Sequence, residues 1–475
     1  MAGAAGIPGA VPGSQPAGAS DERLSVEQIL SYSLPALGMP LVLVSVAIYL
    51  PNFYTDELGV TAGMLSWVFL LGRVWDAVTD PIMGHLSDHT HSRFGRRRPY
   101  FLLSALPIWA VFYLIWSPSP SLSQTATFVH LLVCYLALYT AWTIFSIPYL
   151  SLGMELTPAY HERTRLFGGR QAFFIAGTAL GMMAPTFFAR AFGGKQVGYP
   201  RMALVVGGLA AILIGVAFVR IRERPGLVRS QSLGFFEGLR VTFRNRSFVV
   251  LLFVYLFSLV GASFIAPLSL YMAKYVIRAE WVMEYVLLAY LAGSLVSIPL
   301  WMRLSKRIGK NRTWTAALLL AIVGYTLSYS YHEGTWVRWI VLAVVVGAAS
   351  GCTQMLGPAL SADVIDSDEL ETGHRREGAF VGVWSFIDKA AIGLAVFLGL
   401  QGLEAIGYRP NVEQTPTVIM GMKLLYCVLP AAFHIVALLI FQRFPITPEV
   451  HARIRAQLDA RRTASAAVAP ARSSR

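Results

Sequence analysis

Charged side chains are scarce in this sequence. Asp, Glu, Lys and Arg make up 14% of the 475 residues, whereas 55% of the residues are hydrophobic. A soluble protein of ordinary composition carries about 25% charged residues. Apolar stretches of about twenty residues recur along nearly the whole chain, and each is long enough to cross a bilayer. The composition therefore excludes a soluble globular enzyme and predicts an all-α, multi-pass membrane protein.

Cysteine is also rare. Cys134, Cys352 and Cys427 all fall within apolar segments, so they form neither a disulfide framework nor a metal-ligand pattern. Buried cysteine behaves as a small apolar residue, and we expect all three in the core. The sequence also lacks a His/Cys metal spacing, a nucleophile motif and a phosphate-binding loop. We therefore expect no enzymatic activity and no cofactor.

The net charge of +13 is unevenly distributed along the chain. When residues 29–51 are taken as the first span, most of the 39 Lys and Arg residues fall on one side of the membrane. By the positive-inside rule that side is cytoplasmic, and both termini lie on it. The excess of basic residues thus reflects the membrane topology, and we do not expect nucleic-acid binding.

Twelve spans are expected, six on each side of a long basic segment. They lie at residues 29–51, 62–85, 100–117, 126–155, 170–191, 201–220, 247–273, 281–302, 312–331, 336–362, 378–403 and 417–442. This layout is typical of transporters built from two repeated halves, with the substrate site between the halves. Short basic turns with a central Gly follow the second and the eighth span, at 93–98 and 306–312, which favours an internal repeat.

The expected organisation has five parts. They are an N-terminal tail at 1–27, a six-helix half at 28–220, a cytoplasmic connecting loop at 221–246, a second six-helix half at 247–443 and a cytoplasmic tail at 444–475. The first tail consists mostly of Ala, Gly, Pro and Ser, which cannot bury a core, so we expect it to be disordered.

The second expected span carries the most informative residues. Arg73, Asp76 and Asp80 occur there at helical spacing within an apolar segment. Ionisable residues inside a membrane are rare and usually mark an ion or substrate path. Asp76 and Asp80 are four residues apart, so both carboxylates lie on one helix face. Two such carboxylates cannot both stay ionised in a dry site without a cation or a basic partner. The pair therefore predicts a site for Na⁺, Li⁺ or H⁺, with Arg73 as a nearby partner.

Other polar and aromatic residues fall within expected spans. Lys389 lies near the middle of the eleventh, where a lysine needs an acidic partner or a water-filled cavity. Aromatic side chains such as Trp142 can stack on a sugar ring, although helix packing is the alternative for any single aromatic. Hydroxyls such as Thr143 can simply bond to their own helix. The candidate substrate-cavity residues are Arg73, Tyr139, Trp142, Ser146, Gln171, Gln354, Trp384 and Lys389.

Charged residues also gather at the expected cytoplasmic mouth. Residues 363–371 contain five acidic side chains. This stretch can pair with basic loops of the other half and hold one gate state closed, or it can form a solvated charged loop; both interpretations stay open. The candidate gate residues are Arg93, Arg96, Arg97, Arg98, Glu155, Arg163, Asp363, Asp366, Arg375 and Arg376.

Three motifs, in this order, resemble the glycoside-pentoside-hexuronide:cation symporters, a family of the major facilitator superfamily that includes the melibiose permease. They are GRVWDAVTDPIMG at 72–84, IPYLSL at 147–152 with its continuation to 166, and DVIDSDEL at 363–370 with RREGAF at 375–380. The resemblance covers about residues 27 to 445 and implies the major facilitator fold, with twelve transmembrane helices in two halves.

The resemblance also implies roles for individual residues. Asp76 and Asp80 correspond to carboxylates that hold the coupling cation. Thr79 corresponds to a residue that tunes cation choice, and Thr143 to a hydroxyl ligand. Lys389 corresponds to a lysine that contacts the two acids. In the sugar pocket, the aromatic residue of the family corresponds to Trp142.

The sugar site departs from the family's pattern. Pro40 and Ser146 stand where the melibiose permease has two aspartates that bind galactoside hydroxyls. Because the charge-assisted hydrogen bonds that sugar hydroxyls donate to carboxylates largely specify a sugar, the loss of both acids argues against a melibiose-like substrate. Another glycoside, an anionic sugar near Arg73 or Lys389, or a more apolar solute such as a lysophospholipid fits the remaining residues.

We therefore predict a monomeric secondary transporter of the cell inner membrane that couples Na⁺ or H⁺ to symport of a sugar or related solute. A sodium-coupled lysophospholipid carrier and a proton-driven exporter are the alternatives. A membrane sensor or scaffold is disfavoured, because the tail after Arg443 is short.

Overall fold

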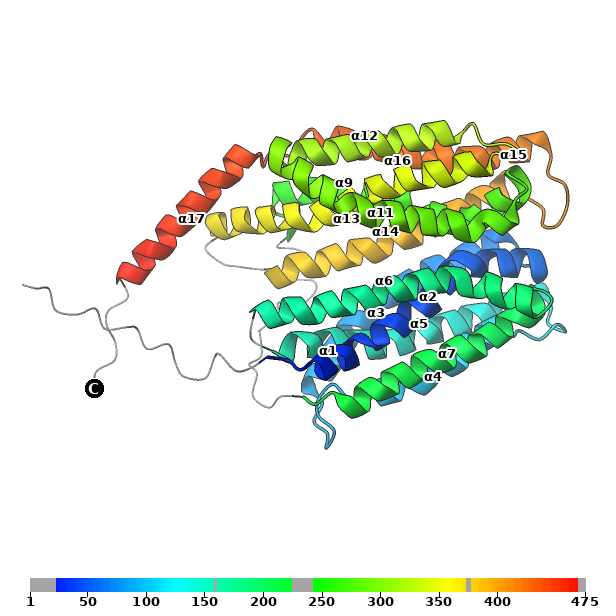
Figure 1. Ribbon diagram of the computed structural model, residues 1–475, viewed down its shortest axis with the longest axis horizontal. Coiled ribbons are helices and arrows are strands. Elements are labelled where there is room, and N and C mark those ends of the chain that lie inside the picture. The colour runs from blue at the N-terminus through cyan, green and yellow to red at the C-terminus, as the bar shows by residue number, and fades with distance from the viewer. Residues whose placement is uncertain (1–22, 158–159, 224–241, 373–376, 469–475) are drawn as a thin grey trace, which may run out of the picture.

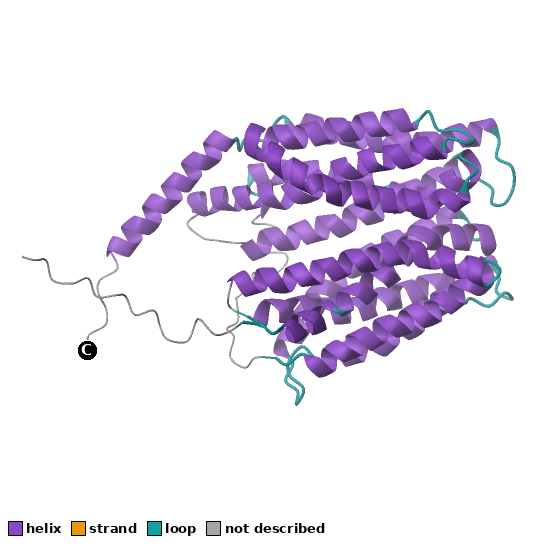
Figure 2. Cartoon of the chain, in the orientation of Figure 1, coloured by secondary structure: helices purple, strands orange, loops and turns teal. Residues whose placement is uncertain are grey.

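The computed structural model describes residues 23–157, 160–223, 242–372 and 377–468, and within them the regular structure is helical, without a strand (Figure 2). The first helices are α1 (Val26–Ser33), α2 (Pro35–Asn52), α3 (Ala62–His89), α4 (Pro99–Trp116), α5 (Gln124–Glu155), α6 (Tyr160–Ala191) and α7 (Lys195–Arg220). They are followed by α9 (Arg246–Ser263), α10 (Ile265–Tyr271), α11 (Met283–Ile308), α12 (Lys310–Ser328), α13 (Trp336–Thr372), α14 (Glu377–Ala405), α15 (Pro416–Lys423), α16 (Leu429–Phe441) and α17 (Pro448–Val468).

Ten helical segments of the described chain are long and apolar enough to cross a membrane. Two further long helices, α3 and α12, pack within the same bundle, α3 against α5 and α14, and α12 against α13 and α16. Helix α3 carries Arg73, Asp76 and Asp80, which lower its hydropathy. Together these segments make the twelve helices that the sequence predicted.

The helices form two groups that lie side by side (Figure 1). The first group, α1 to α7, is held by contacts such as those of α2 with α6 and of α4 with α7. The second group, α9 to α16, is held by contacts such as those of α11 with α13 and of α9 with α16. Between the groups, α3 packs against α14, α2 against α10, and α6 against α11.

The bundle has two distinct ends. Helix α17 lies at one end, on the left of Figure 1, which we call the tail end. At the opposite end, which we call the far end, α2 and α10 each finish in a π-helical turn, η1 (Phe53–Glu57) and η2 (Met272–Val276). A short 3-10 turn, η3 (Glu280–Val282), leads from there into α11. The same ending on the first membrane span of each group agrees with an internal repeat.

Local sequence sets where the functional helices begin. Thr61 precedes α3, and its hydroxyl accepts a hydrogen bond from the Met64 N–H at 3.2 Å. Asn245 caps α9 in the same way, from the Phe248 N–H at 3.0 Å. Such caps satisfy N–H groups that a helix start leaves without a partner.

Two helices extend beyond the apolar stretches that predicted them. Helix α6 begins ten residues earlier than expected, so Arg163 lies on a helix. Helix α13 continues to Thr372, so the acidic stretch is helical up to that residue and is not a loop. Hydrophobicity marks only the part of a helix inside the bilayer, whereas the helix continues wherever its polar side chains find partners. The tail likewise contains α17, a helix of 21 residues.

Most of the first tail, the middle of the connecting loop and the last residues, at 1–22, 224–241 and 469–475, lie outside the described residues. The three cysteines are buried and free, which confirms their predicted core positions.

Candidate functional site

The predicted cation-site residues meet where α3, α5 and α14 come together. Arg73, Asp76 and Asp80 lie on α3, Thr143 on α5 and Lys389 on α14. Because α3 belongs to the first helix group and α14 to the second, the site spans the boundary between the groups. A relative movement of the groups must therefore change its geometry.

Asp76 is almost fully buried, with its side chain 1% exposed. Its Oδ2 atom lies 3.4 Å from the Arg73 guanidinium and 3.8 Å from the Lys389 ammonium. Its Oδ1 atom is buried and has no hydrogen-bond partner among the described residues. A buried carboxylate oxygen without a partner is costly, and such an atom is where an ion can bind.

Asp80 is more open, with its side chain 21% exposed. Thr143 donates its hydroxyl to Asp80 Oδ1 at 3.0 Å, and the Lys389 ammonium donates to Oδ2. The Lys389 side chain is itself 24% exposed, so its charge lies at the edge of the accessible part of the site. The formal charges of Arg73 and Lys389 balance those of the two aspartates.

Proline leaves a backbone oxygen of α3 without its helical hydrogen bond in the same stretch. Pro81 lies within α3 and lacks the N–H that would bond to the Ala77 carbonyl one turn earlier. The Ala77 carbonyl is thus released from the helix ladder between Asp76 and Asp80. Carboxylate, hydroxyl and carbonyl oxygens are the ligands that hard cations prefer.

Several predicted residues do not join this cluster directly. Thr79 donates its hydroxyl back to the Trp75 carbonyl at 3.0 Å, within α3. Trp142 and Ser146 are half-buried on α5, and Gln171 is exposed on α6. The roles predicted for these residues, in cation choice for Thr79 and in the substrate cavity for the other three, remain predictions.

Of the predicted aromatic residues, Tyr139 contacts the cluster. Tyr139 lies beneath the Arg73 guanidinium, whose carbon is 5.0 Å from the ring centre. Trp384, on α14, packs on Tyr255 with ring centres 4.1 Å apart. Gln354 bonds to Ser350 within α13 at 3.2 Å.

At the tail end, the predicted gate arginines pair within the first helix group. Arg97 bonds to Asp88 at 2.8 Å and to Glu155 at 2.7 Å, and Arg96 reaches Glu155 at 2.7 Å. Although burial lowers the pKa of Arg97, Glu155 and Asp88 outweigh this effect and raise it. Among these contacts, none joins the two groups.

The remaining gate arginines also have local partners. Arg98 donates to the Phe218 carbonyl at 3.1 Å, and Arg163 to the Thr157 carbonyl at 2.8 Å. Arg93 stacks on its neighbour, Phe94. Arg375 and Arg376 lie outside the described residues.

The predicted gate acids Asp363 and Asp366 pair within the second group and its tail. Lys310 binds Asp363 at 2.6 Å. His451 of α17 lies 3.4 Å from Asp363 and 3.2 Å from Asp366, and Arg455 of α17 lies 2.9 Å from Asp366. In this arrangement Asp363 and Asp366 hold the C-terminal helix against the second group.

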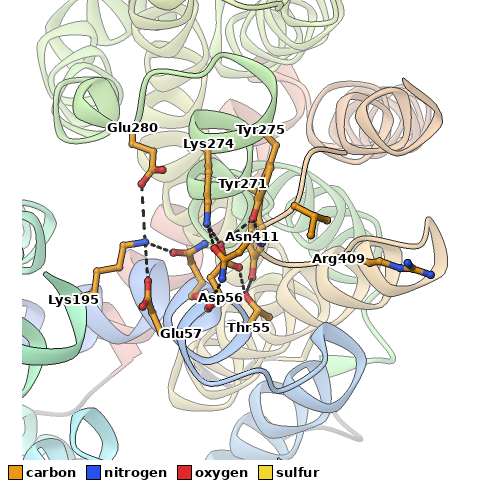
Figure 3. Close-up of polar contacts among 12 residues, drawn as sticks. Thr55, Asp56, Glu57, Lys195, Tyr271, Lys274, Tyr275, Glu280, Arg409 and Asn411 are labelled. Carbon is orange, nitrogen blue, oxygen red and sulfur yellow. Dashed lines mark hydrogen bonds and ion pairs between the residues drawn. The ribbon is translucent and has the colours of Figure 1, made fainter. Parts of the chain in front are cut away.

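A polar cluster at the far end was not among the predicted site residues (Figure 3). The buried Asp56 carboxylate of η1 accepts hydrogen bonds from Lys274 at 2.5 Å, Tyr275 at 3.1 Å and Tyr408 at 2.5 Å. Burial raises the pKa of Tyr408, so its hydroxyl stays protonated and donates. Asn411 donates to the Asp56 carbonyl. All four partners belong to the second group or its loops.

Further bonds between the groups surround this far-end cluster. Arg190 of α6 binds Glu284 of α11 at 2.7 Å. Lys195 lies 4.0 Å from Glu280, across the same boundary (Figure 3). Glu404 of α14 accepts the Gly63 N–H at 3.1 Å, near the start of α3. The far end is thus closed by polar contacts between the groups.

The sequence held one signal for this cluster. Asp56 and Lys274, of opposite charge, occur just after the first span of each half. An internal repeat places such positions at the same end of the molecule. Their contact still required knowledge of how the two groups pack, because 218 residues separate them.

Comparisons with known proteins agree with this architecture. A family model described as MFS/sugar transport protein matches residues 31–448. The isoprimeverose transporter of Lactiplantibacillus pentosus is 28% identical, over 93% of this chain and 94% of its own length. The glucuronide carrier protein homolog of Escherichia coli is 27% identical, over 93% and 97%.

Two more distant similarities are informative. The sodium-dependent lysophosphatidylcholine symporter 1-A of Danio rerio is 25% identical, over 84% of this chain and 82% of its own. Among solved structures, the nucleoside transporter NupG matches with a TM-score of 0.62 at 13% identity, over 88% of this chain and 99% of that one. That likeness shows a shared fold.

Proposed function

The chain belongs to the MFS/sugar transport protein family, and on this premise we propose that it couples the symport of a sugar, a glycoside or a related solute to Na⁺ or H⁺. Membership confirms the family and the major facilitator fold that the sequence motifs predicted. It also makes the chain an integral membrane carrier rather than an enzyme.

The observation that carries the coupling proposal is the Asp76/Asp80 pair at the boundary between the groups. One carboxylate keeps a buried oxygen without a partner among the described residues, and the other is bonded to Lys389. The Lys389 ammonium stands where a cation would bind. A coupling cation that binds between the carboxylates takes over its role, and Lys389 then moves away from Asp80.

This exchange links cation binding to the arrangement of the helix groups. Lys389 comes from α14 and the aspartates from α3, so the cation-free site ties the groups together by charge. A bound cation would instead be held by side chains of α3 and α5, both in the first group. Thr143 of α5, which already bonds to Asp80 of α3, is one of them. By linkage, a substrate that favours the cation-bound arrangement must raise cation affinity by the same factor.

We assign the tail end to the cytoplasm, because the basic loops lie there. The polar contacts that close the far end, and the tail-end pairs that stay within one group, then support an inward-facing arrangement. Transport by alternating access requires the far-end contacts to break as tail-end contacts between the groups form.

The named relatives support a sugar or glycoside as the substrate class. Arg73 and Lys389 would suit an acidic sugar, which matches the name of the glucuronide carrier homolog. The fish relative favours a second candidate, a sodium-coupled lysophospholipid carrier. The two candidates differ in the ligand that should stabilise the protein.

The test is thermal unfolding of the purified protein with glycosides, hexuronides and lysolipids, each in Na⁺, Li⁺ or K⁺ at two pH values. A ligand that binds the folded state raises its melting temperature. We expect a sugar or hexuronide shift that grows with Na⁺ or at low pH. A shift with lysolipid alone would move the chain to the second candidate.

Charge-neutral variants locate the cation. We expect Asp80→Asn to remove cation dependence and to leave the protein folded, since Asn keeps the size of the side chain and can still bond to Thr143. If transport by a variant with both Asp76→Asn and Asp80→Asn were still fully stimulated by the cation, the cation would bind elsewhere and the proposal would be wrong.

A further inference from the structure

Gly393 of α14 packs directly against the side chain of Arg73. A Cβ atom added at Gly393 would lie 2.5 Å from Arg73 Cγ and 2.9 Å from Arg73 Cβ. Real Cβ atoms do not come closer than 3.0 Å to another heavy atom. Helix α14 therefore has a notch at this position, and the stem of Arg73 fills it.

The lack of room for a side chain, and not an unusual backbone conformation, explains why residue 393 is a glycine. Gly393 lies inside a regular helix and does not adopt positive φ. Inside a helix, glycine is less favourable than alanine by about 1 kcal/mol. The neighbour that forbids a side chain is Arg73, which comes from the other helix group.

Arg73 in turn controls the surroundings of Asp76. Its guanidinium lies 3.4 Å from Asp76 Oδ2 and rests on the ring of Tyr139. The stem between Cβ and Cδ sets where this charge lies. Any shift of the stem at the notch therefore moves the guanidinium relative to the carboxylate.

Gly393 also stands one helical turn after Lys389, so the two residues share a face of α14. That face presents a charge to Asp80 and leaves room for Arg73 to reach Asp76. The register of α14 against α3 thus sets both positive charges of the cluster.

We propose that Gly393 is a positioning residue for the cation site, which acts by seating Arg73 beside Asp76. This inference rests on the proposed cation coupling. When Arg73 is seated, it stabilises the cation-free site and repels an incoming cation. Gly393→Ala unseats it, which weakens the cation-free protein and tightens cation binding.

The probe is Na⁺ alone, titrated while thermal unfolding of the full-length protein is followed, with Li⁺ and pH as further arms. For Gly393→Ala we expect a lower melting temperature without Na⁺ and an apparent Kd for Na⁺ lowered about three- to tenfold, the range that one net hydrogen bond supplies. The matched control is Gly382→Ala on the same helix, where an added Cβ meets nothing within 4 Å. It should leave the Na⁺ affinity at the wild-type value and, by helix propensity alone, raise rather than lower the melting temperature.

These readouts separate positioning from packing. A purely structural role would lower the melting temperature and leave the Na⁺ affinity unchanged or weaker, and either result overturns the proposal. If the wild type itself did not respond to Na⁺, Li⁺ or pH, the cation coupling would be refuted, and the inference with it.

A double-mutant cycle tests the notch without any cation. Arg73→Gly removes both atoms that crowd Gly393, so in that background Gly393→Ala should no longer destabilise the protein. If Gly393→Ala alone does not fold, recovery of folding in the double variant tests the same contact. If the destabilisation persisted in the Arg73→Gly background, the glycine would be required by something other than Arg73.

Discussion

Thr143 makes the bond in the cation site that can be removed with the smallest change of shape. Its buried hydroxyl donates to Asp80 Oδ1 at 3.0 Å. Valine has nearly the same shape but no hydroxyl. We expect Thr143→Val to weaken Na⁺ binding by up to about tenfold, because it removes both a bond that orients Asp80 and one oxygen near the cation. Isothermal titration with Na⁺ measures this effect.

Serine at the same position provides the control. Thr143→Ser keeps the hydroxyl and should stay within a factor of two to three of the wild type, a difference of well under 1 kcal/mol. Equal losses in Thr143→Val and Thr143→Ser would mean that the methyl group, and not the oxygen, matters at this position.

Single residues differ in how far the sequence could place them. Asp76 and Asp80 were predictable as a pair because their spacing within one helix fixes their common face. Lys389 was predictable only as a charge that needs a partner, and the family resemblance named that partner. The contact between Arg73 and Gly393 gave no signal, because a glycine in an apolar helix does not reveal which side chain it accommodates.

At the scale of elements, α13 and α17 show how charged stretches continue helices beyond the membrane. Asp366 of α13 accepts bonds from His451 and Arg455 of α17, and Ile454 of α17 is buried. The apolar pattern predicted α13 only to about residue 362. Its continuation depends on partners far along the chain, which local sequence does not reveal.

We therefore expect Asp366→Asn to loosen α17 from the bundle. Trypsin should then cleave at the arginines of α17 several-fold faster, because cleavage follows the population of the locally open state. Cation affinity should not change, since the site between α3 and α14 is distant in the fold. Glu449→Gln, at an exposed residue of α17, is the matched control.

If trypsin cleaved Asp366→Asn and Glu449→Gln at similar rates, the contacts of Asp366 with His451 and Arg455 would not be what holds α17 on the bundle. Docking would then depend on the buried apolar residues Ile454 and Leu458.

At the scale of the whole molecule, the two ends differ in what holds the helix groups together. The far end has Asp56 with Lys274, Arg190 with Glu284 and Glu404 with the start of α3. Composition and spacing predicted two halves. They did not predict which end is closed, because that depends on contacts between residues far apart in the sequence, such as Asp56 and Lys274, which are 218 positions apart.

We expect Asp56→Asn to shift the protein towards an arrangement that is open at the far end. Asparagine leaves the Lys274 ammonium without its carboxylate partner in the closed arrangement. A bond to a charged group contributes about 1.5–3 kcal/mol, so its loss shifts the ratio of the two arrangements by about ten- to a hundredfold. Spin labels at Ser121 and Val412, exposed at the far end in different groups, report the separation by pulsed electron resonance.

A second label pair, at the exposed residues His91 and Lys306, reports the tail end, and the native cysteines are buried, which keeps them from the label. Alternating access requires the far-end distance to lengthen as the tail-end distance shortens. Arg278→Gln is the matched control, because it removes a far-end charge whose partners, Glu333 and Glu413, lie in the same group. If Asp56→Asn moved neither distance, or Arg278→Gln moved both equally, the Asp56 cluster would not be what holds the far end closed.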